Sequence, residues 1–432
     1  MHKMIYSGIS WIGEIPETWC VRKLNSIASV ITDYVASGSF ADLAANVQYL
    51  DYPDYAMLVR TADLSGTRDN TVYINEHAYN FLSNSNLFGG EVILSNIGSV
   101  GNVFYFEPKY ERNSLAPNAI MINGCECNRY IYYWFLNPVA NDELKRIGSH
   151  AVQLKFNKTQ LRQFPIVCPP ADEQRKIAAA LDTECAKIDT LIANVQAQID
   201  KLKSYKQSMI VDAVTKGLDR SVPMKESGVD WVKRIPAGWE MLYPKALFTQ
   251  RKDRAKPTDR QLTASQQFGI MDQEEYMAMT GTRVVVVEKD FDILKHVEAG
   301  DFVISMRSFQ GGLEYSEISG CISSAYVMLK PSSDRVYSRY YRWLLKSSLY
   351  INAIRSTSNL VRDGQAMRYA NFIQIWLPCP PMDEQKTIAD YLDEKCPQID
   401  RLITIKQAKI EKLEQYKKSL IYEYVTGKKE VS

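Results

Sequence analysis

Glu384-Gln385-Lys386 is the triplet whose residue types and spacing come nearest to a catalytic site in this sequence. It resembles the acid-x-Lys end of a nuclease site, which would serve phosphodiester cleavage. An earlier segment carries Glu173-Gln174-Arg175 at the corresponding place, and both triplets stand in the first turn of a predicted helix. Carboxylates in that turn interact favourably with the helix dipole. We therefore interpret both triplets as helix-capping residues.

The other residues that could do chemistry form no catalytic or metal-binding pattern. Cys125-Glu126-Cys127 has the wrong spacing for zinc and no companion pair, so we expect no metal there. Asn137-Pro138 is followed by Val139, whereas an adenine-amino methyltransferase would carry Asn/Asp-Pro-Pro-Tyr/Phe. The sequence has no Gly-x-x-x-x-Gly-Lys-Ser/Thr phosphate loop, and its histidines show no ligand spacing (His2, His77, His150 and His296). We therefore expect binding rather than catalysis, with no catalytic residue, metal or cofactor in this chain.

The elements that carry these residues occur twice. Segment 169–215 begins Pro-Pro-Ala-Asp-Glu-Gln, and segment 380–426 begins Pro-Pro-Met-Asp-Glu-Gln. At a constant offset of 211, they share 25 identities over 47 positions. A second repeated piece, residues 7–19, recurs as 227–239. We name these pieces the Pro-Pro box and the Trp box. The inserts between them differ, which predicts two different binding domains in one symmetric frame.

A long helix is predicted after each Pro-Pro box. Apolar residues recur there at alternating steps of four and three, which is the pattern of a coiled-coil seam. A lysine interrupts the seam at the same place in each copy, and we expect Lys206 and Lys417 to help set the register. The predicted interface residues are Ile188, Ile192, Val195, Ile199, Leu202, Ile399, Ile403, Ile410, Leu413 and Leu420.

Pro397 suggests where the second long helix begins. Proline is poor inside a helix but good at its first position. We therefore predict a short helix over about 383–394 and a long one restarting near 397, with the corresponding restart near Ala186. A helix over 397–425 would be roughly 43 Å long at about 1.5 Å per residue. Two such helices would form an antiparallel rod between two globular heads; the alternative is that each helix packs on its own domain.

The inserts share a skeleton typical of mixed α and β structure. Residues 90–95 and 300–305 each read as a turn entering a strand, and 129–134 and 339–344 as short amphipathic helices. The repeated cysteines have apolar neighbours and are interpreted as core residues (Cys168, Cys379, Cys185 and Cys396). We predict an α+β fold with an internal pseudo-twofold repeat. Its parts are 1–168 (Trp box and first variable domain), 169–217 (helical), 218–379 (Trp box and second variable domain) and 380–432 (helical).

Composition sets broad limits. The 432 residues suffice for two or three domains, and a hydrophobic content of 46% is normal for globular proteins. No apolar run approaches the roughly 20 residues needed to span a bilayer, and the N-terminus lacks the apolar stretch of a signal peptide. We expect a cytoplasmic protein without membrane contact. The net charge of +2 argues weakly against nucleic-acid binding, although basic residues cluster at 251–256 and 355–368.

The combination of repeated motifs resembles the specificity subunit of type I restriction-modification systems. The resemblance rests on Trp-Ile-Gly-x-Ile-Pro-x-x-Trp at 11–19, on Pro-Pro-x-x-Glu-Gln with its long helix, and on the duplication of both. It covers essentially the whole chain. It implies that each insert is a target recognition domain for one half of a split, asymmetric site in double-stranded DNA. It also implies that the helices set the gap between the half-sites. Successive major-groove faces on one side of DNA lie about 34 Å apart, a distance that a rod of roughly 43 Å can span.

The same resemblance implies partner subunits. Two methyltransferase (modification) subunits would dock on the chain and carry S-adenosylmethionine for adenine methylation. Motor-nuclease (restriction) subunits, which use ATP and Mg, would complete a system for defence against foreign DNA. This chain would have no activity alone.

The variable domains contain side chains suited to DNA. Arginine, asparagine and glutamine suit purine edges, and lysine suits phosphates. In the first insert we predict DNA contacts from Arg60, Arg68, Asn70, Asn96, Lys155 and Lys158. In the second insert we predict them from Arg251, Lys252, Arg254, Arg307, Gln310, Arg362 and Arg368.

Two other functions account for parts of the sequence. A coiled-coil scaffold or adaptor with two protein-binding heads would fit the low net charge. A self-contained nuclease or methyltransferase would require the motifs that the sequence lacks.

Overall fold

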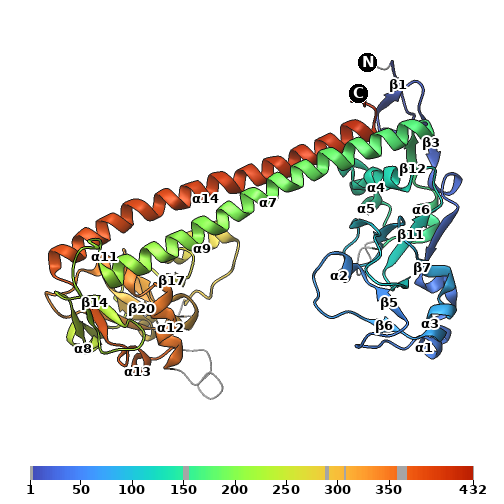
Figure 1. The fold of residues 1–432 in the computed structure, drawn as a ribbon. Helices are drawn as coiled ribbons and strands as arrows, with labels where there is room; N and C mark the ends of the chain where they lie inside the picture. The colour runs from blue at the N-terminus through green and yellow to red at the C-terminus, as the bar shows by residue number, and fades with distance from the viewer. Residues whose placement is uncertain (1–2, 149–154, 288–290, 306–307, 358–366, 432) are drawn as a thin grey trace. The chain divides into compact units, whose positions relative to one another are not determined.

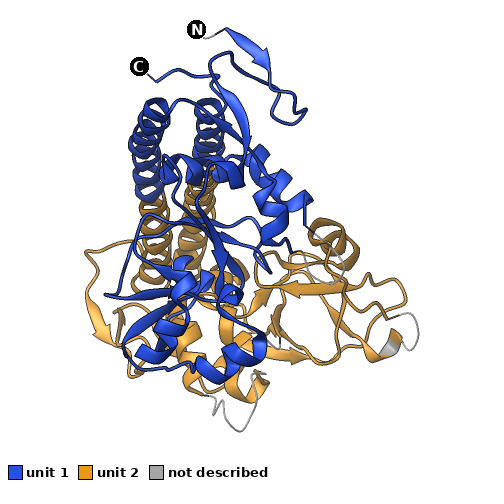
Figure 2. Cartoon of the chain, turned by 90° about the vertical axis from the view of Figure 1, so that its right-hand side faces the viewer, with its two compact units in different colours: residues 1–195, 408–432 blue, residues 196–407 orange. Residues whose placement is uncertain are grey.

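A computed structural model describes residues 3–148, 155–287, 291–305, 308–357 and 367–431. The chain divides into two compact units, coloured separately in Figure 2. Unit 1 contains residues 1–195 and 408–432, and unit 2 contains residues 196–407. Two long helices, α7 (Ala171–Lys216) and α14 (Met382–Val425), run through both units (Figure 1). Each unit therefore contains part of both long helices together with its own α+β domain.

The two long helices pair antiparallel within each unit. In unit 1, Lys417 Nζ donates to both carboxylate oxygens of Asp189 at 2.7 Å. In unit 2, Lys206 Nζ donates to Asp400 at 2.7 and 2.6 Å. A step of 17 residues forward along α7, from 189 to 206, matches a step of 17 back along α14, from 417 to 400. The helices therefore keep one register in both units, and these are the two lysines that were expected to set it.

The predicted seam residues occupy the inner face of the pair. They are buried or half-buried, whereas most helix positions around them are exposed. Ile199 and Leu420 are almost fully buried. Burial of one such aliphatic side chain contributes roughly 1.5–3 kcal/mol, so the seam supplies most of the drive for pairing and the lysine pairs fix its alignment.

The predicted interruption at Pro397 is wrong. Helix α14 is continuous from Met382 to Val425, and α7 is continuous through Ala186. A proline within a helix removes one backbone hydrogen bond and costs about 3 kcal/mol. Here Cys396 and Ile399, on either side of the proline, are buried in the core of unit 2 or its helix seam. Tertiary packing therefore holds the helical conformation that the local preference opposes.

The domain of unit 1 is built on a four-stranded antiparallel sheet with the order β4-β11-β8-β9. A second sheet, β6-β5-β10-β7, contains a parallel β5–β10 pair. The elements before α7 are β1 (Met4–Tyr6), β2 (Glu14–Pro16), β3 (Cys20–Lys23), η1 (Leu24–Ser26), β4 (Val30–Asp33), η2 (Tyr34–Ser37), α1 (Phe40–Asn46), β5 (Ala56–Val59), α2 (Thr61–Leu64), β6 (Tyr73–Ile74), α3 (Glu76–Phe81), η3 (Ser83–Ser85), β7 (Asn86–Leu87), β8 (Val92–Ser95), β9 (Val103–Tyr105), β10 (Asn113–Leu115), β11 (Ala119–Asn123), α4 (Asn128–Leu136), α5 (Pro138–Arg146), α6 (Lys158–Arg162) and β12 (Pro165–Cys168).

The domain of unit 2 repeats the first sheet and replaces the rest. Its sheet has the order β16-β23-β20-β21, again antiparallel, and two separate antiparallel pairs, β17–β18 and β19–β22, stand in place of the second sheet. The elements between α7 and α14 are β13 (Met224–Glu226), β14 (Arg234–Pro236), β15 (Glu240–Leu242), α8 (Pro244–Leu247), β16 (Phe248–Arg251), β17 (Leu262–Ser265), β18 (Gly269–Asp272), α9 (Gln273–Thr280), η4 (Phe291–Ile293), β19 (Lys295–Val297), β20 (Phe302–Ile304), α10 (Ser308–Gly311), β21 (Glu314–Tyr315), β22 (Gly320–Ile322), β23 (Val327–Pro331), α11 (Ser338–Leu344), α12 (Ser348–Ser356), α13 (Tyr369–Phe372) and β24 (Leu377–Cys379).

The shared skeleton expected from the sequence is confirmed. The turns at Gly90 and Gly300 have positive φ and lead into β8 and β20. The predicted amphipathic helices are α4 and α11. The four repeated cysteines lie in the cores as predicted. Among the described residues, no helix combines the length and apolar character needed to cross a membrane.

An equivalent junction in each unit joins the Trp box to the Pro-Pro box. Trp19 Nε1 donates to Glu173 Oε2 at 3.0 Å in unit 1. Trp239 Nε1 donates to Glu384 Oε2 at 2.8 Å in unit 2. Both indole rings are buried, and a buried N–H without an acceptor costs about 1–3 kcal/mol. The two glutamates lie in the first helical turn as predicted, and their side chains also bind the other repeated box.

A buried tyrosine in each domain holds the end of the other long helix. In unit 1, the Tyr130 hydroxyl lies 2.8 Å from the carbonyl of Val167 and 3.2 Å from that of Val425, and it donates between the two. In unit 2, the Tyr340 hydroxyl donates to the carbonyl of Val214 at 2.8 Å. Each domain is therefore bound to the start of the long helix that follows it and to the C-terminal end of the other one.

The junction of unit 2 should be sensitive to a side chain at Gly217. This residue has a φ of +71°, and an added Cβ would lie 2.7 Å from Glu384 Oε1. We expect Gly217→Ala to lower the free energy of unfolding by about 1–3 kcal/mol, since strain and the displaced glutamate add. Thermal unfolding of the full chain measures this. Gly238→Ala is the matched control, because its Cβ would meet nothing within 4 Å; equal melting temperatures for the two variants would contradict the assignment.

Candidate nucleic-acid interface

A cavity in unit 1 lies beside three of the residues predicted to contact DNA. It has a volume of about 380 Å³ and is bounded by the end of β4, by α1 and by the turn before β11. Asn96 lines it. Lys158 is bound to Asp33 of its wall, and Lys155 forms a β-bridge with Ile97, another wall residue. We name this space the α1 cavity. The tertiary structure thus brings Asn96, Lys155 and Lys158 to one place, although the first two are 59 positions apart in the sequence.

The walls of the α1 cavity are mainly apolar and aromatic. Its lining residues are Asp33, Tyr34, Val35, Phe40, Leu43, Ala44, Val47, Tyr49, Asn96, Ile97, Pro117, Asn118 and Ala119. Phe40 is 83% exposed and Tyr49 is 52% exposed. Burial raises the pKa of the Tyr34 hydroxyl, and a hydrogen bond with Tyr49 adds to this, so Tyr34 is a neutral phenol near pH 7.

The polar groups of the α1 cavity are partly satisfied. The Asp33 carboxylate is paired with Lys158 Nζ at 2.7 Å. Asn96 Nδ2 donates to the carbonyl of Phe156 at 3.2 Å. The Asn96 Oδ1 atom is buried and finds no hydrogen-bond donor in the described part of the chain. A buried acceptor without a donor is unfavourable by about 1–3 kcal/mol. Because the Oδ1 atom itself is inaccessible, it does not face the open cavity.

Arg60 has a role within its own loop. Its guanidinium binds Asp63 through Nε at 2.9 Å and through Nη2 at 2.5 Å, and Nη2 also donates to the carbonyl of Asn70. The hydrogen bond with Asp63 raises the pKa of Arg60. Only 18% of the side chain is exposed, so we reassign Arg60 from base contact to loop scaffold. Arg68 and Asn70 are exposed in the same loop and stay predictions as DNA contacts.

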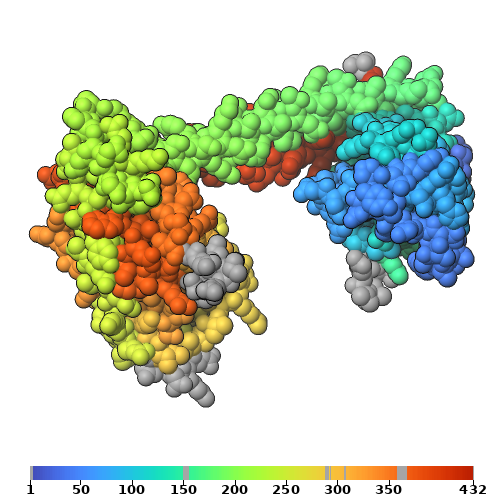
Figure 3. Space-filling model, turned by 60° about the horizontal axis from the view of Figure 1, so that its bottom comes forward, coloured from blue at the N-terminus to red at the C-terminus, as the bar shows by residue number. Residues whose placement is uncertain are grey.

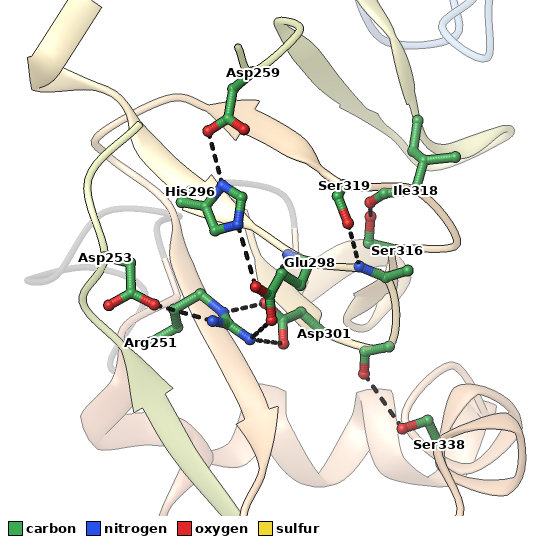
Figure 4. A network of polar contacts seen from close by, with 12 residues as sticks. Arg251, Asp253, Asp259, His296, Glu298, Asp301, Ser316, Ile318, Ser319 and Ser338 are labelled. Atoms are coloured by element: carbon green, nitrogen blue, oxygen red, sulfur yellow. Dashed lines mark hydrogen bonds and ion pairs between the residues drawn. The ribbon is translucent and has the colours of Figure 1, made fainter. Parts of the chain in front are cut away.

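The Arg251 side chain likewise binds groups in the interior of its own domain. The side chain is buried and binds three carboxylates, Asp301 at 2.6 Å, Glu298 at 2.7 Å and Asp253 at 3.0 Å (Figure 4). These bonds, above all the one with Asp301, raise the pKa of Arg251. Its guanidinium has no free edge to offer a base, so we reassign it to the scaffold of unit 2.

His296 extends this network, which the spacing of histidines in the sequence did not reveal. Its Nδ1 lies 2.7 Å from Asp259 Oδ2, and its Nε2 lies 3.5 Å from Glu298 Oε1 (Figure 4). The imidazole is buried between the two carboxylates. Since Glu298 also binds Arg251, a connected set of polar contacts lies on this side of the domain, and the Arg251 ion pairs hold β16 to the turn before β20.

The remaining predicted residues of unit 2 lie at its surface or outside the described residues. Lys252, Arg254, Gln310 and Arg368 are exposed. Arg307 and Arg362 lie outside the described residues. The exposed four stay predictions as DNA contacts.

Four exposed apolar residues on the long helices were missed by the sequence reasoning. Leu191 and Leu402 are repeat partners, as are Tyr205 and Tyr416, and each is about half exposed. Each stands directly before a seam residue, so all four lie on the same flank of the seam. Figure 3 shows the side chains of α7 (green) at the surface. The constant offset of 211 between the repeats could have identified them, because it relates Leu191 to Leu402 and Tyr205 to Tyr416 outside the heptad stripe.

The lysine pairs bring one leucine and one tyrosine to the same level in each unit. The Lys417–Asp189 bond brings Tyr416 level with Leu191 in unit 1. The Lys206–Asp400 bond brings Tyr205 level with Leu402 in unit 2. We name these the Leu–Tyr pairs. The offset of 211 relates the two pairs, although Ile405, which is 60% exposed, adds apolar surface near Leu402 where the other copy has Asn194.

Known proteins are similar to this chain over differing shares of its length. Residues 16–201 match the family model of the type I restriction modification DNA specificity domain. The putative type I restriction enzyme MjaX specificity subunit of Methanocaldococcus jannaschii is 26% identical over 96% of this chain and 95% of its own length. The MjaVIII specificity subunit of the same organism is 24% identical over 63% of this chain and 64% of its own length.

One solved structure has a similar fold. It is a chain from work on complex assembly and conformational transition of the type I R-M system, and it is 14% identical to this chain. The match covers 96% of this chain and 99% of that one with a TM-score of 0.67.

The ion-pair network of unit 2 should depend on Arg251. We expect Arg251→Met to lower the free energy of unfolding by about 3–5 kcal/mol, because it leaves the buried Asp301 without its main partner. Chemical denaturation of the full chain measures the change. Lys252→Met, at the exposed neighbour, should change it by less than about 0.5 kcal/mol. Adding Asp301→Asn to Arg251→Met should restore part of the loss; no recovery would mean that packing, not charge, was lost.

Proposed function

The chain belongs to the specificity subunits of type I restriction-modification systems, which are not catalytic themselves. We propose that its two variable domains bind the two halves of a split site in double-stranded DNA. The observation that carries this proposal is the contrast between frame and surface. The same Trp–Glu junction, tyrosine contact and four-stranded sheet occur in both units. The side chains mounted on that sheet differ.

The strand ends β4 and β16 illustrate the difference. Asp33 and Arg251 occupy the corresponding last position of these strands, opposite Ile120 and Met328. One carries a negative charge that is paired with a lysine, and the other a positive charge that is paired with carboxylates. Both residues are buried, but they show that the two domains carry unlike side chains at one position of a shared frame, and we therefore expect an asymmetric target. Lys155, Lys252 and Arg254 supply cations for phosphate contacts in this proposal, whereas Lys158 is paired with Asp33.

The two long helices serve as the ruler between the half-sites in this proposal. They are 46 and 44 residues long and keep a single antiparallel register. A seam with one register has a defined length, whereas a flexible linker has a distribution of lengths. A defined gap between the half-sites requires helices of defined length.

The Leu–Tyr pairs are the docking points for two methyltransferase subunits in this proposal. Two equivalent apolar surfaces suit two copies of one protein, and they lie outside the variable domains, where a partner that serves any target sequence must bind. S-adenosylmethionine, ATP and Mg then belong to the partner subunits, and adenine methylation requires the target base to leave the stack.

Lengthening both helices tests the ruler. Seven residues inserted after Gln198 in α7 and after Lys406 in α14 preserve the seam, since these residues contact each other. The insertion adds about 10 Å, so the methylated sites should show a gap longer by about three base pairs at roughly 3.4 Å each. Mapping methylated adenines in cells that carry the variant and its partner subunits measures the gap. The same seven residues added at the C-terminus should leave it unchanged, and an unchanged gap in both strains would exclude the helices as the ruler.

Removing the exposed tyrosines tests the docking surface. Tyr205→Ala with Tyr416→Ala should weaken binding of the methyltransferase subunits at least tenfold, because buried aromatic residues dominate interface energies. Affinity and stoichiometry are measured by titration with purified partner subunits, and the unaltered chain should hold two. Lys201→Ala with Lys412→Ala is the matched control, since these exposed residues are also repeat partners on the same helices. Equal affinities for both double variants would place docking elsewhere.

A further inference from the structure

Two cysteines of unit 1 lie directly opposite each other where the Trp box meets the Pro-Pro box. Cys20 follows Trp19 and begins β3, and Cys168 precedes Pro169 and ends β12. The antiparallel register of these strands pairs Cys168 with Cys20. The Cys20 thiol donates to the carbonyl of Cys168 at 3.7 Å. Two thiols that are 148 positions apart in the sequence are therefore neighbours in the fold.

The register places the two α-carbons within reach of a disulfide bond. Opposed residues of an antiparallel pair have α-carbons about 4.5–5.5 Å apart and side chains on the same face of the sheet. A disulfide bond requires an α-carbon separation of about 4.4–6.8 Å. Rotation of the two side chains can therefore join Cys20 and Cys168 while the strands stay in place.

Both thiols face one cavity of unit 1. It has a volume of about 290 Å³, and three of its lining residues are cysteines, namely Cys20, Cys125 and Cys168. We name it the thiol cavity. Cys20 is exposed, Cys125 is half-buried and Cys168 is buried. A small reagent from solvent therefore meets Cys20 first, and the cavity gives it room beside Cys168.

The buried thiols are poor nucleophiles. Burial raises the pKa of the Cys168 thiol to about 12; the neighbouring Cys20 adds to the rise, and the charge of Arg22 opposes it. Burial likewise raises the pKa of the Cys125 thiol to about 12. Both thiols are protonated near pH 7, whereas the thiolate is the reactive form. The exposed Cys20 is therefore the point of first attack, and Cys168 reacts second.

Unit 2 shows that the repeated frame does not require a thiol pair at this place. In its corresponding strands, β15 and β24, Glu240 lies opposite Cys379. The Glu240 carboxylate accepts a hydrogen bond from Arg335 Nη2 at 2.8 Å. One frame thus accommodates either an ion-paired carboxylate or a second thiol opposite the same buried cysteine. The thiol pair is consequently a property of unit 1 and not of the packing of the junction.

We propose that Cys20 and Cys168 form a reversible disulfide bond by exchange with a low-molecular-weight disulfide of the glutathione class. Cys20 Sγ first attacks one sulfur of the reagent, which leaves a mixed disulfide on Cys20 and releases one thiol with the Cys20 proton. Cys168 Sγ then attacks the Cys20 sulfur, the mixed disulfide breaks, and the second thiol leaves with the Cys168 proton. The two cysteines are oxidised, and the reagent is reduced to two thiols.

The bond would act on the junction itself. It joins the end of the Trp box to the start of the Pro-Pro box, beside the hydrogen bond between Trp19 and Glu173. A covalent link across the loop from 20 to 168 restricts the opened chain and so favours the closed junction. We expect amide hydrogen exchange in β3 and β12 to slow by at least roughly tenfold on oxidation. Exchange in β15 and β24, which have no thiol pair, should stay unchanged.

The test uses the purified full chain without DNA or partner subunits, so its outcome is independent of the proposed function. The reduced chain is equilibrated with mixtures of glutathione and glutathione disulfide, free thiols are alkylated, and unreduced peptides are identified by mass spectrometry. We expect a linked peptide pair that contains Cys20 and Cys168, forms as the disulfide fraction rises, and disappears with dithiothreitol. Cys168→Ala should stop at the mixed disulfide on Cys20, and Cys20→Ser should give neither product.

Cys125→Ala is the matched control, because Cys125 lines the same cavity without lying opposite Cys20. It should leave the linked pair and the slowed exchange intact. Thermal unfolding checks that the variants fold, and Cys20→Ser alters only an exposed side chain, so it tests the bond even if Cys168→Ala is unstable. Full alkylation of Cys20 and Cys168 at every glutathione ratio would overturn the proposal. A mixed disulfide that goes no further in the unaltered chain, or a link from Cys20 to Cys125, would overturn it as well.

Discussion

The structure depends on one requirement, that the buried indole N–H of each Trp box must find an acceptor. In both units the acceptor is the glutamate of the Pro-Pro box, at 3.0 Å for Trp19 and 2.8 Å for Trp239. This bond joins segments about 150 residues apart in the sequence and thereby closes each variable domain onto the start of a long helix. The glycines that end the other helix pack against the same tryptophans. The domain and the two helix ends are consequently held at one point in each unit.

Such a junction explains how the domains can differ while the frame stays the same. Polar contacts between each domain and the helices come from the boxes and from several residues of α4 or α11. Tyr130 and Tyr340 bind the end of one long helix. Arg129 and Tyr133 bind Asp182 of the other helix in unit 1, and Arg339 and Arg342 bind Asp393 in unit 2. Surfaces as unlike as the α1 cavity and the Arg251 network can therefore be exchanged on one scaffold without loss of its internal packing.

Much of this architecture could be predicted because it depends on local sequence patterns. The heptad stripe, the glycine before each strand and the amphipathic helices are periodic or short-range signals, and the structure contains them. The break at Pro397 was predicted by an equally sound local rule, yet α14 is continuous, because buried neighbours on both sides hold the helix. The local preference against proline inside a helix amounts to a few kcal/mol. The free energy gained by packing the seam and the core is larger.

In the candidate site, too, some properties follow from the sequence and others only from the tertiary structure. The sequence by itself determined the duplicated frame, the pairing of the helices and the set of charged residues available for DNA, since repeats and periodicity are properties of the chain. Only the tertiary structure decided which charges are free. It buried Arg251 among carboxylates, folded Arg60 back on Asp63, and placed Asn96 beside Phe40 in a cavity. The reason is that the partner of a charge and the exposure of a ring depend on residues far away in sequence, and no local pattern records them.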